Sequence, residues 1–193
     1  MIEYIKGTVD SISPAQAIVE TGGIGYELCI SLTTFTAIQQ MKEVKLLTHE
    51  VIREDAHQLF GFYTDRERIL FRQLIGVSGV GANTARMILS SFAPADLETI
   101  IASSDSRRLK NVKGIGAKTA ERIIVDLKDK IKPAGDTLLS ISTPVSEIYE
   151  EALSALVMLG FPRPQSQKVL GKIFKETPDA TVEAAIKKAL SML

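Results

Sequence analysis

The sequence predicts an α+β protein of several small domains: an N-terminal β-barrel, a helical domain, a flexible linker and a C-terminal three-helix bundle. Three observations support this fold class. Short β-rich runs with glycine-rich turns fill the first third of the chain, apolar residues at helical spacing follow from Thr64, and a segment rich in Pro, Gly, Ser and Thr interrupts the helices. We therefore expect domains at residues 1–63, 64–131 and 146–193, with residues 132–145 as the linker.

The first domain is expected to contain about five short strands. Residues 26–30 alternate in hydrophobicity, and Gly22-Gly23-Ile24-Gly25 before them suits a hairpin turn. A second hairpin is expected from residues 44–52 and 58–62, joined by Arg53-Glu54-Asp55-Ala56. Short strands joined by such turns indicate a small barrel or sandwich.

Helix signals mark the two later domains. Thr64-Asp65-Arg66-Glu67 has the spacing of a capping box, in which the hydroxyl and the carboxylate each accept a backbone N–H at the start of a helix. Helices are expected from there to about Ile131. In the C-terminal bundle, Ser146 is the expected N-cap of the first helix and Gly160 its expected end.

Composition excludes several classes of protein. At 193 residues and 45% hydrophobic, the chain can bury cores, but no apolar stretch approaches the ~18 residues of a membrane span. The N-terminus has no basic segment followed by an apolar run, so a secretory signal peptide is not expected. The single cysteine, Cys29, excludes an internal disulfide and a cysteine-rich zinc site, and only His49 and His57 could supply imidazole ligands. We expect a cytoplasmic protein with no membrane association, metal or cofactor.

The zero net charge of the whole chain hides an uneven distribution. Residues 1–63 hold 4 Lys/Arg against 8 Asp/Glu, a net of −4, and residues 133–193 hold 6 against 7, a net of −1. Residues 64–132 hold 13 against 8, a net of +5. A basic segment between neutral or acidic ones is typical of a nucleic-acid footprint confined to one domain.

A repeat with an offset of 35 residues carries the functional prediction, since residues 74–88 match residues 109–123. The aligned small residues are Gly79, Gly81 and Ala85 in the first copy and Gly114, Gly116 and Ala120 in the second. Each copy predicts an apolar helix, a tight Gly-apolar-Gly turn and a second helix with a small residue facing the first. Two ordinary helical hairpins would explain the glycines but not the local charge of +5.

The two turns predict phosphate sites. A helix that starts directly after the turn points free N–H groups and the positive end of its dipole outward, and phosphate suits that site. Backbone amides do not read bases, so the grip would be independent of sequence. The expected phosphate-binding residues are Gly79, Gly81, Asn83, Thr84, Arg86, Lys113, Gly114, Gly116, Lys118, Thr119 and Arg122.

The tandem repeat resembles the helix-hairpin-helix motif of DNA-binding proteins. Together with Gly22-Gly23-Ile24-Gly25-Tyr26-Glu27, Arg53-Glu54-Asp55-Ala56 and Leu159-Gly160-Phe161, it makes the whole chain resemble the RuvA family, the DNA-binding subunits of the bacterial Holliday junction branch-migration complex. The resemblance implies a barrel of the oligonucleotide/oligosaccharide-binding (OB) type, a tandem helix-hairpin-helix domain and a mobile three-helix domain similar to ubiquitin-associated domains.

The resemblance also implies partners. Members form homotetramers that hold a four-way DNA junction open for recombination and repair, recruit the RuvB ATPase through the C-terminal domain and work in the same complex as the RuvC resolvase. Whether one tetramer or an octamer of two binds the junction stays open. The ATPase activity is expected in RuvB, so the chain itself is expected to be non-catalytic.

Two further sites follow from the resemblance. Glu54 and Asp55 match the acidic pair of the family, which lies at the junction centre, where the carboxylates of four copies would repel phosphate and keep strands apart. Contacts with the motor are expected among Leu156, Leu159, Gly160 and Phe161. Core packing is the preferred interpretation for most of these four, and Phe161 is the better interface candidate.

The first hairpin departs from the family pattern. Many members carry a lysine two residues after the second glycine, where this chain has Asn83. Asn83 and Thr84 can donate hydrogen bonds but bring no charge, and Arg86 compensates only if its side chain points toward the turn. The second hairpin, with Lys118, is therefore expected to bind phosphate more strongly.

Two other function classes stay open. A glycosylase or nuclease would need metal-binding carboxylates or a catalytic Lys/Asp pair, but Asp126 and Asp129 fit a solvated helix of alternating charge. His49 and His57 fit surface positions on strands. A general duplex-binding adaptor is the non-enzymatic alternative, and such a protein has no use for the acidic pair.

Overall fold

The computed structural model describes residues 1–131 and 144–193, and the side chains of residues 1–131 and 148–193. The chain divides into two compact units, Met1–Asp136 and Thr137–Leu193. All but the last two residues of the expected linker, 132–145, lie outside the described residues. Those two residues begin the first helix of the second unit, which starts at Pro144. Ser146 is therefore not its N-cap, and the earlier start agrees with the preference of proline for the first position of a helix.

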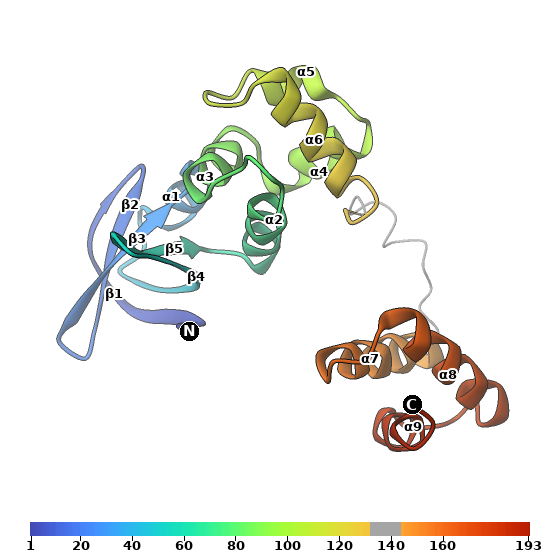
Figure 1. The fold of residues 1–193 in the computed structure, drawn as a ribbon. Coiled ribbons are helices and arrows are strands. Elements are labelled where there is room, and N and C mark those ends of the chain that lie inside the picture. The colour runs from blue at the N-terminus through green and yellow to red at the C-terminus, as the bar shows by residue number, and fades with distance from the viewer. Residues whose placement is uncertain (132–143) are drawn as a thin grey trace. The chain divides into compact units, whose positions relative to one another are not determined.

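A closed five-stranded barrel forms the first part of the first unit (Figure 1). Its strands are β1 (Tyr4–Ser13), β2 (Gln16–Thr21), β3 (Ile24–Ile30), β4 (Glu43–Arg53) and β5 (Ala56–Phe62). They close in the order β1-β2-β3-β5-β4, with every pair antiparallel except β3 and β5. This arrangement confirms the OB-type barrel and decides against the sandwich. Ile5, Val19, Leu28, Ile30 and Leu46 fill its interior.

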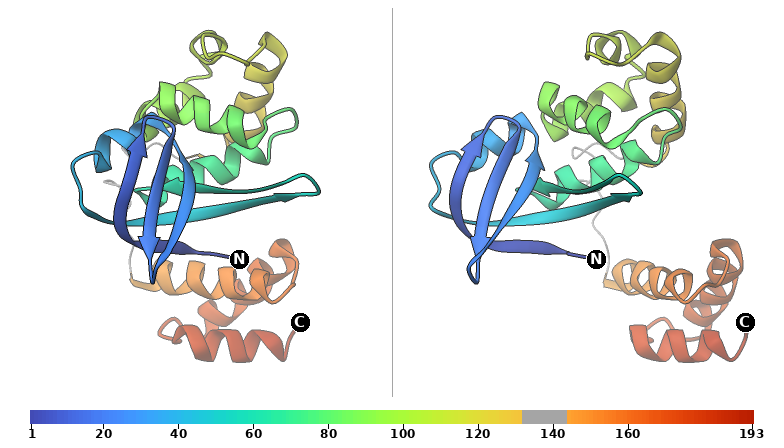
Figure 2. Two further views of the ribbon diagram at one scale, coloured as in Figure 1. Left: turned by 90° about the vertical axis from the view of Figure 1, so that its left-hand side faces the viewer. Right: turned by 60° about the vertical axis from the view of Figure 1, so that its left-hand side comes forward.

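The β4–β5 hairpin extends beyond the wall of the barrel (Figure 2). Strand β1 pairs with β4 only as far as Leu47, and β3 pairs with β5 only at Leu59–Gly61. Residues 51–58 therefore pair only with each other, from Val51↔Gln58 to Arg53↔Ala56, and form a two-stranded ribbon that ends in the turn Glu54-Asp55.

The helix α1 (Leu32–Ile38), between β3 and β4, was not expected from the sequence. Its segment is rich in β-branched residues, which weaken the helix signal. Contacts with helix α3 (Ala82–Ser91) hold it in place, because the Thr33 hydroxyl donates to the Leu89 carbonyl at 2.8 Å and Leu32 N–H donates to Ser90 Oγ at 3.0 Å.

Five helices follow the barrel in the same unit. They are α2 (Asp65–Ile75), α3 (Ala82–Ser91), α4 (Pro94–Ala102), α5 (Ser106–Lys110) and α6 (Ala117–Leu127). Thr64 caps α2 as predicted, with its hydroxyl accepting from Glu67 N–H at 3.3 Å. The reciprocal half of the capping box is wrong: the Glu67 carboxylate is buried and instead accepts hydrogen bonds from the hydroxyls of Ser31 and Thr34.

The second unit is a three-helix bundle, as predicted, of α7 (Pro144–Met158), α8 (Arg163–Glu176) and α9 (Val182–Leu190). Its core contains Leu153, Leu156, Leu170 and Ile173. Gly160 ends the first helix as expected, with a φ of 97° and the Phe161 N–H donating back to the Leu156 carbonyl at 3.1 Å.

Candidate nucleic-acid interface

The two repeated turns have nearly the same backbone geometry. Gly79 and Gly114, the first glycines, have φ values of 91° and 90°, in the left-handed region that favours glycine. Val80 and Ile115, the apolar residues between the glycines, insert into the shared helical core and are 5% and 7% exposed. The repeat seen in the sequence is therefore a repeat of structure.

The helices after the turns begin without side-chain caps. Gly81 and Gly116 are the N-cap residues of α3 and α6, and neither has a side chain that could accept the N–H groups of the first turn. The first backbone bonds to these caps come from Ala85 to the Gly81 carbonyl at 2.9 Å and from Ala120 to the Gly116 carbonyl at 3.0 Å. Within residues 1–131 the N–H groups of the three residues after each cap have no protein acceptor, so they can bind an anion.

Folding does not explain why the cap residues are glycines. Gly81 and Gly116 have φ values of −84° and −82°, which any residue adopts, and a Cβ placed on either would have no atom within 4 Å. Serine, threonine, asparagine or aspartate would cap these helices as well or better. A bare backbone at these two positions is expected where a ligand approaches closely.

Several of the expected phosphate-binding side chains lie at the turns. Asn83, Lys113 and Lys118 are exposed, and Thr84 and Thr119 are half-buried. The exposed guanidinium of Arg122 donates to the Ser78 carbonyl at 3.4 Å, so this second-hairpin residue reaches the first turn.

Arg86 does not take the role expected for it. Its Nη1 donates to the barrel carbonyls of Ala15 at 2.8 Å and Ile30 at 3.4 Å, and its Nε is buried. At this helical position the side chain projects toward the barrel, so it fastens α3 there and does not supply the charge that Asn83 lacks.

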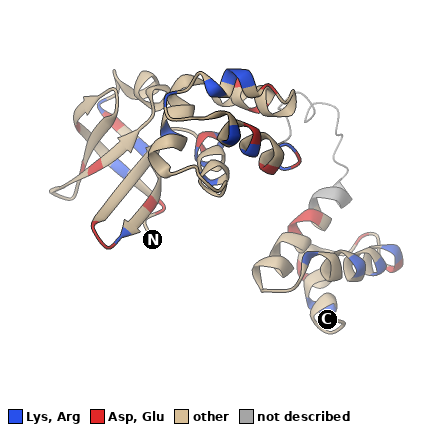
Figure 3. Cartoon of the chain, turned by 45° about the horizontal axis from the view of Figure 1, so that its top comes forward, with Lys and Arg blue, Asp and Glu red and all other residues tan. Residues whose placement is uncertain are grey.

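The structure adds basic residues that the sequence analysis left out of the site. Arg107, Arg108 and Lys110 are exposed on α5, the short helix that leads into the second turn. Lys and Arg side chains are spread over the helices of this unit (Figure 3). The run Arg107-Arg108-Leu109-Lys110 is visible in the sequence as part of the +5 charge, and its position shortly before Gly114 is the signal that could have placed it at the site.

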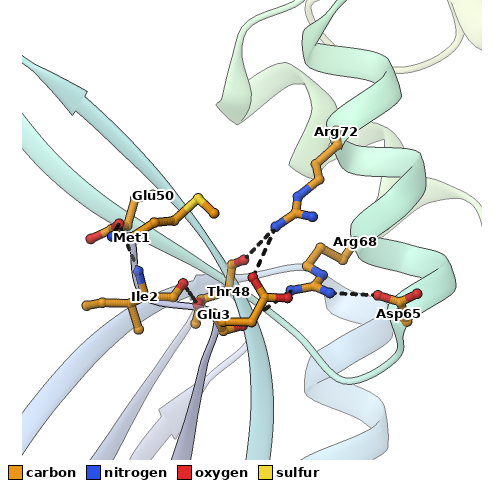
Figure 4. Close-up of polar contacts among 8 residues, drawn as sticks. All are labelled: Met1, Ile2, Glu3, Thr48, Glu50, Asp65, Arg68 and Arg72. Carbon is orange, nitrogen blue, oxygen red and sulfur yellow. Dashed lines mark hydrogen bonds and ion pairs between the residues drawn. The ribbon is translucent and has the colours of Figure 1, made fainter. Parts of the chain in front are cut away.

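Two arginines of helix α2, the buried Arg68 and the half-buried Arg72, fix the helix against the barrel (Figure 4). The Arg68 guanidinium is paired with Glu3 and Asp65, at 2.8 Å from the Asp65 carboxylate, and also donates to the Glu3 carbonyl at 3.2 Å. Arg72 donates to the Thr48 carbonyl at 3.5 Å. On another side of the helix, burial raises the pKa of the Glu67 carboxyl. These contacts set the hairpins in a defined position relative to the β4–β5 ribbon.

The acidic pair lies at the end of that ribbon. Glu54 and Asp55 form its two-residue turn and are both exposed. The exposed Arg53 directly precedes them in the chain. Ile52, on the adjoining strand, is 70% exposed.

The four residues expected to bind the motor differ in accessibility. Leu156 is fully buried in the core of the bundle, so it cannot contact a partner directly, and Phe161 packs partly against the same core. Leu159 is 61% exposed and follows Met158, which is 89% exposed. The exposed apolar surface at the end of α7 therefore favours Leu159 over Phe161.

The residues considered for catalysis do not gather. Within the described ranges, no group of three or more His, Cys, Asp or Glu side chains is placed to hold a metal ion. His57 is exposed and His49 is half-buried: the His49 ring packs edge-on against Phe71 at 5.4 Å between ring centroids, and burial lowers the pKa of His49. Among the described helices, none is long and apolar enough to cross a membrane.

Three sequence-family models match consecutive parts of the chain. They are the RuvA N-terminal domain at residues 1–61, the SAM-like helix-hairpin-helix tandem at residues 71–129 and the RuvA C-terminal domain at residues 147–193. Relatives named Holliday junction branch migration complex subunit RuvA include those of Bacteroides thetaiotaomicron, 51% identical, Parabacteroides distasonis, 53% identical, and Porphyromonas gingivalis, 48% identical. In each comparison the alignment covers 100% of both chains.

Proposed function

Because the chain belongs to the RuvA family, we propose that it binds four-way DNA junctions without sequence preference, as a subunit of a Holliday junction branch migration complex. The observation that carries this proposal is the pair of equivalent hairpin turns, whose uncapped helix N-termini offer two phosphate sites on one surface. Both sites use backbone N–H groups, so they suit any sequence. Lys113, Lys118, Arg122 and the basic residues of α5 add the charge.

The acidic turn supplies the preference for a junction over a linear duplex. Glu54 and Asp55 stand at the end of a ribbon that leaves the barrel, so they can enter the centre of a junction while the hairpins bind its arms. Their carboxylates repel phosphate and disfavour strands that close over the centre. A linear duplex offers no such opening, and there the same charges only weaken binding.

The assembly and its partners complete the proposal. Four copies arranged around the junction would each bind one arm, as a homotetramer or as two tetramers that enclose the DNA. The chain acts as a non-catalytic scaffold of the bacterial cytoplasm, and the RuvB ATPase moves the DNA, with the RuvC resolvase in the same complex. Leu159 and Met158, both exposed at the end of α7, are the surface offered to RuvB.

Branch migration on a synthetic junction tests this function. The full chain, RuvB, ATP and a junction with labelled strands are mixed, and conversion of the junction to duplex products is followed on native gels. We expect conversion only when all components are present. ATP-independent conversion, or cleavage of DNA by this chain alone, would overturn the scaffold role and favour the enzyme.

A further inference from the structure

A hollow of about 260 Å³ opens on the barrel, and none of its lining residues belongs to the hairpins. It is lined by Ile2, Tyr4, Ile5, Lys6, Thr21 and Tyr26. Its origin lies in the pairing of β1, whose residues 4–8 pair with β4 but whose pairing with β2 begins only at Thr8. Before Thr8 the edge of β1 that faces β2 has no register partner, although Gly7 still packs against Glu20 and Thr21, and the hollow lies beside Tyr4 and Lys6.

One of the lining residues, Lys6, stands directly opposite a second lysine on the neighbouring strand. Lys6 of β1 is the register partner of Lys45 of β4, and both side chains are exposed. Like charges in this position destabilise a strand pair. Within residues 1–131 neither ammonium group forms an ion pair, and the nearby Glu43, two pairs further along the ladder, bonds to neither. The pair thus carries an uncompensated positive charge in a domain whose total charge is −4.

Aromatic rings accompany the charge. The Lys45 ammonium lies 4.1 Å from the centroid of the Tyr4 ring, and Tyr4 is 51% exposed. Tyr26 lines the same hollow and is half-buried. Exposed rings next to cationic groups form the combination that binds single-stranded nucleic acid on barrels of this type, because every base has a face that can stack and every nucleotide a phosphate.

We propose that this hollow binds a nucleotide of unpaired DNA, with the base against Tyr4 and Tyr26 and the phosphate between Lys6 and Lys45. The site recognises no particular base, since stacking and charge supply the binding. It goes beyond the proposed function because it takes single strands and uses none of the hairpin residues. Unpaired nucleotides arise when strands exchange between the arms of a junction, and the barrel can hold them there.

Binding of a labelled oligothymidylate of about ten nucleotides to the full chain, followed by fluorescence anisotropy, tests the proposal. We expect Lys6→Gln/Lys45→Gln to weaken binding about tenfold and to reduce the slope of log K against log salt by about one. Tyr4→Ala is also expected to weaken binding about tenfold. Lys42→Gln and Tyr63→Ala, which change an exposed lysine and a 41% exposed tyrosine outside the hollow, are matched controls and should bind as the parent does.

A second measurement needs no variant. An oligothymidylate carrying 5-iodouracil is photo-crosslinked to the parent chain, and the modified peptide is identified by mass spectrometry. Crosslinks to Tyr4 or Tyr26 support the site, and crosslinks confined to the hairpin turns overturn it. Unchanged oligothymidylate binding by Lys6→Gln/Lys45→Gln would also overturn the proposal. A change in the oligomeric state of that variant would overturn it as well, because the hollow would then bind a second copy of the chain.

The test separates this site from the hairpins. Lys118→Ala is expected to weaken duplex and junction binding while leaving the tenfold effect of Lys6→Gln/Lys45→Gln on oligothymidylate unchanged. Conversely, Lys6→Gln/Lys45→Gln should bind linear duplex as the parent does. Loss of junction preference with intact single-strand binding would count against the proposed function alone.

Discussion

Gly81 and Gly116 begin their helices with almost identical backbone angles, φ −84° and ψ 168° against φ −82° and ψ 169°. They belong to different helices of one compact unit, and Arg122 of the second hairpin bonds to Ser78 in the first turn. Two equivalent anion sites linked in this way suit two phosphates of one DNA backbone.

Gly116→Ser is expected to weaken DNA binding while leaving the protein as stable or slightly more stable. Serine is a better N-cap than glycine by a few tenths of a kcal/mol, and its hydroxyl would occupy the N–H groups that phosphate requires. Its Cβ meets no protein atom within 4 Å. Gel shifts with a linear duplex and thermal unfolding check the two effects. Normal DNA binding by this variant would contradict the assignment of these N–H groups to phosphate.

Gly114→Ala is the matched contrast. Its φ of 90° strains any residue with a Cβ, so we expect a loss of unfolding free energy of about 1–2 kcal/mol. Urea unfolding measures this loss. Equal stability of Gly114→Ala and Gly116→Ser would contradict the division between a glycine required by the fold and a glycine required by the ligand.

Asn83→Lys is expected to strengthen binding to every DNA and to make its salt dependence steeper. One added phosphate contact changes the slope of log K against log salt by about 0.9. Lys118→Ala should reduce the slope by the same amount, whatever the sequence of the duplex. Titrations at several salt concentrations on two unrelated duplexes provide the measurement, and a changed sequence preference would show that these residues read bases.

Glu67→Gln is expected to remove a pH dependence of stability. Burial raises the pKa of the Glu67 carboxyl in the folded chain above its ordinary value of 4.5, which the unfolded chain keeps. Between these two values the folded chain holds more protons, so the contribution of Glu67 to the unfolding free energy falls as pH rises, by at most about 1.4 kcal/mol per pH unit.

The measurement is urea unfolding of the parent and Glu67→Gln across this pH range. The variant should gain stability relative to the parent as pH rises from 4.5. Glutamine also loses part of the bonding to Ser31 and Thr34, which shifts the difference by a constant amount. A difference that does not change with pH would contradict the buried, proton-binding carboxyl.

Leu159→Asp is expected to reduce binding to RuvB without changing the melting temperature, because the side chain is 61% exposed and lies outside the core of the bundle. Leu156→Ala instead removes a fully buried side chain and should cost about 2–5 kcal/mol of unfolding free energy. Calorimetric titration with RuvB and thermal unfolding distinguish the two. Undiminished RuvB binding by Leu159→Asp would place the motor contact elsewhere on the bundle.

Local signals in the sequence predicted most of the fold. Caps and turns depend mainly on the conformation of the few residues around them, so they can be recognised in the sequence. The boundaries of helices and strands were predicted in this way at Thr64, Gly160, Gly22-Gly23 and Glu54-Asp55. Helix α1 was missed because contacts with α3 outweigh the weak helix propensity of its own residues.

The directions of individual side chains could not be predicted from the sequence. Arg86 stands beside the first turn in the sequence, but its helical position aims it at the Ala15 and Ile30 carbonyls of the barrel. Glu67 has the spacing of a capping box and is instead drawn to two hydroxyls of α1, an element absent from the prediction. Both outcomes depend on packing between the barrel and the helices, which no local pattern contains.

Competition between a four-way junction and a linear duplex of the same arm sequences tests the central claim most directly, with the parent and Glu54→Lys/Asp55→Lys compared at one salt concentration. We predict a strong preference of the parent for the junction, and a variant that binds both DNAs at least as tightly but discriminates less between them. The same preference in both proteins would contradict the role of the acidic turn, and equal affinity of the parent for the two DNAs would leave a general duplex-binding adaptor as the better description.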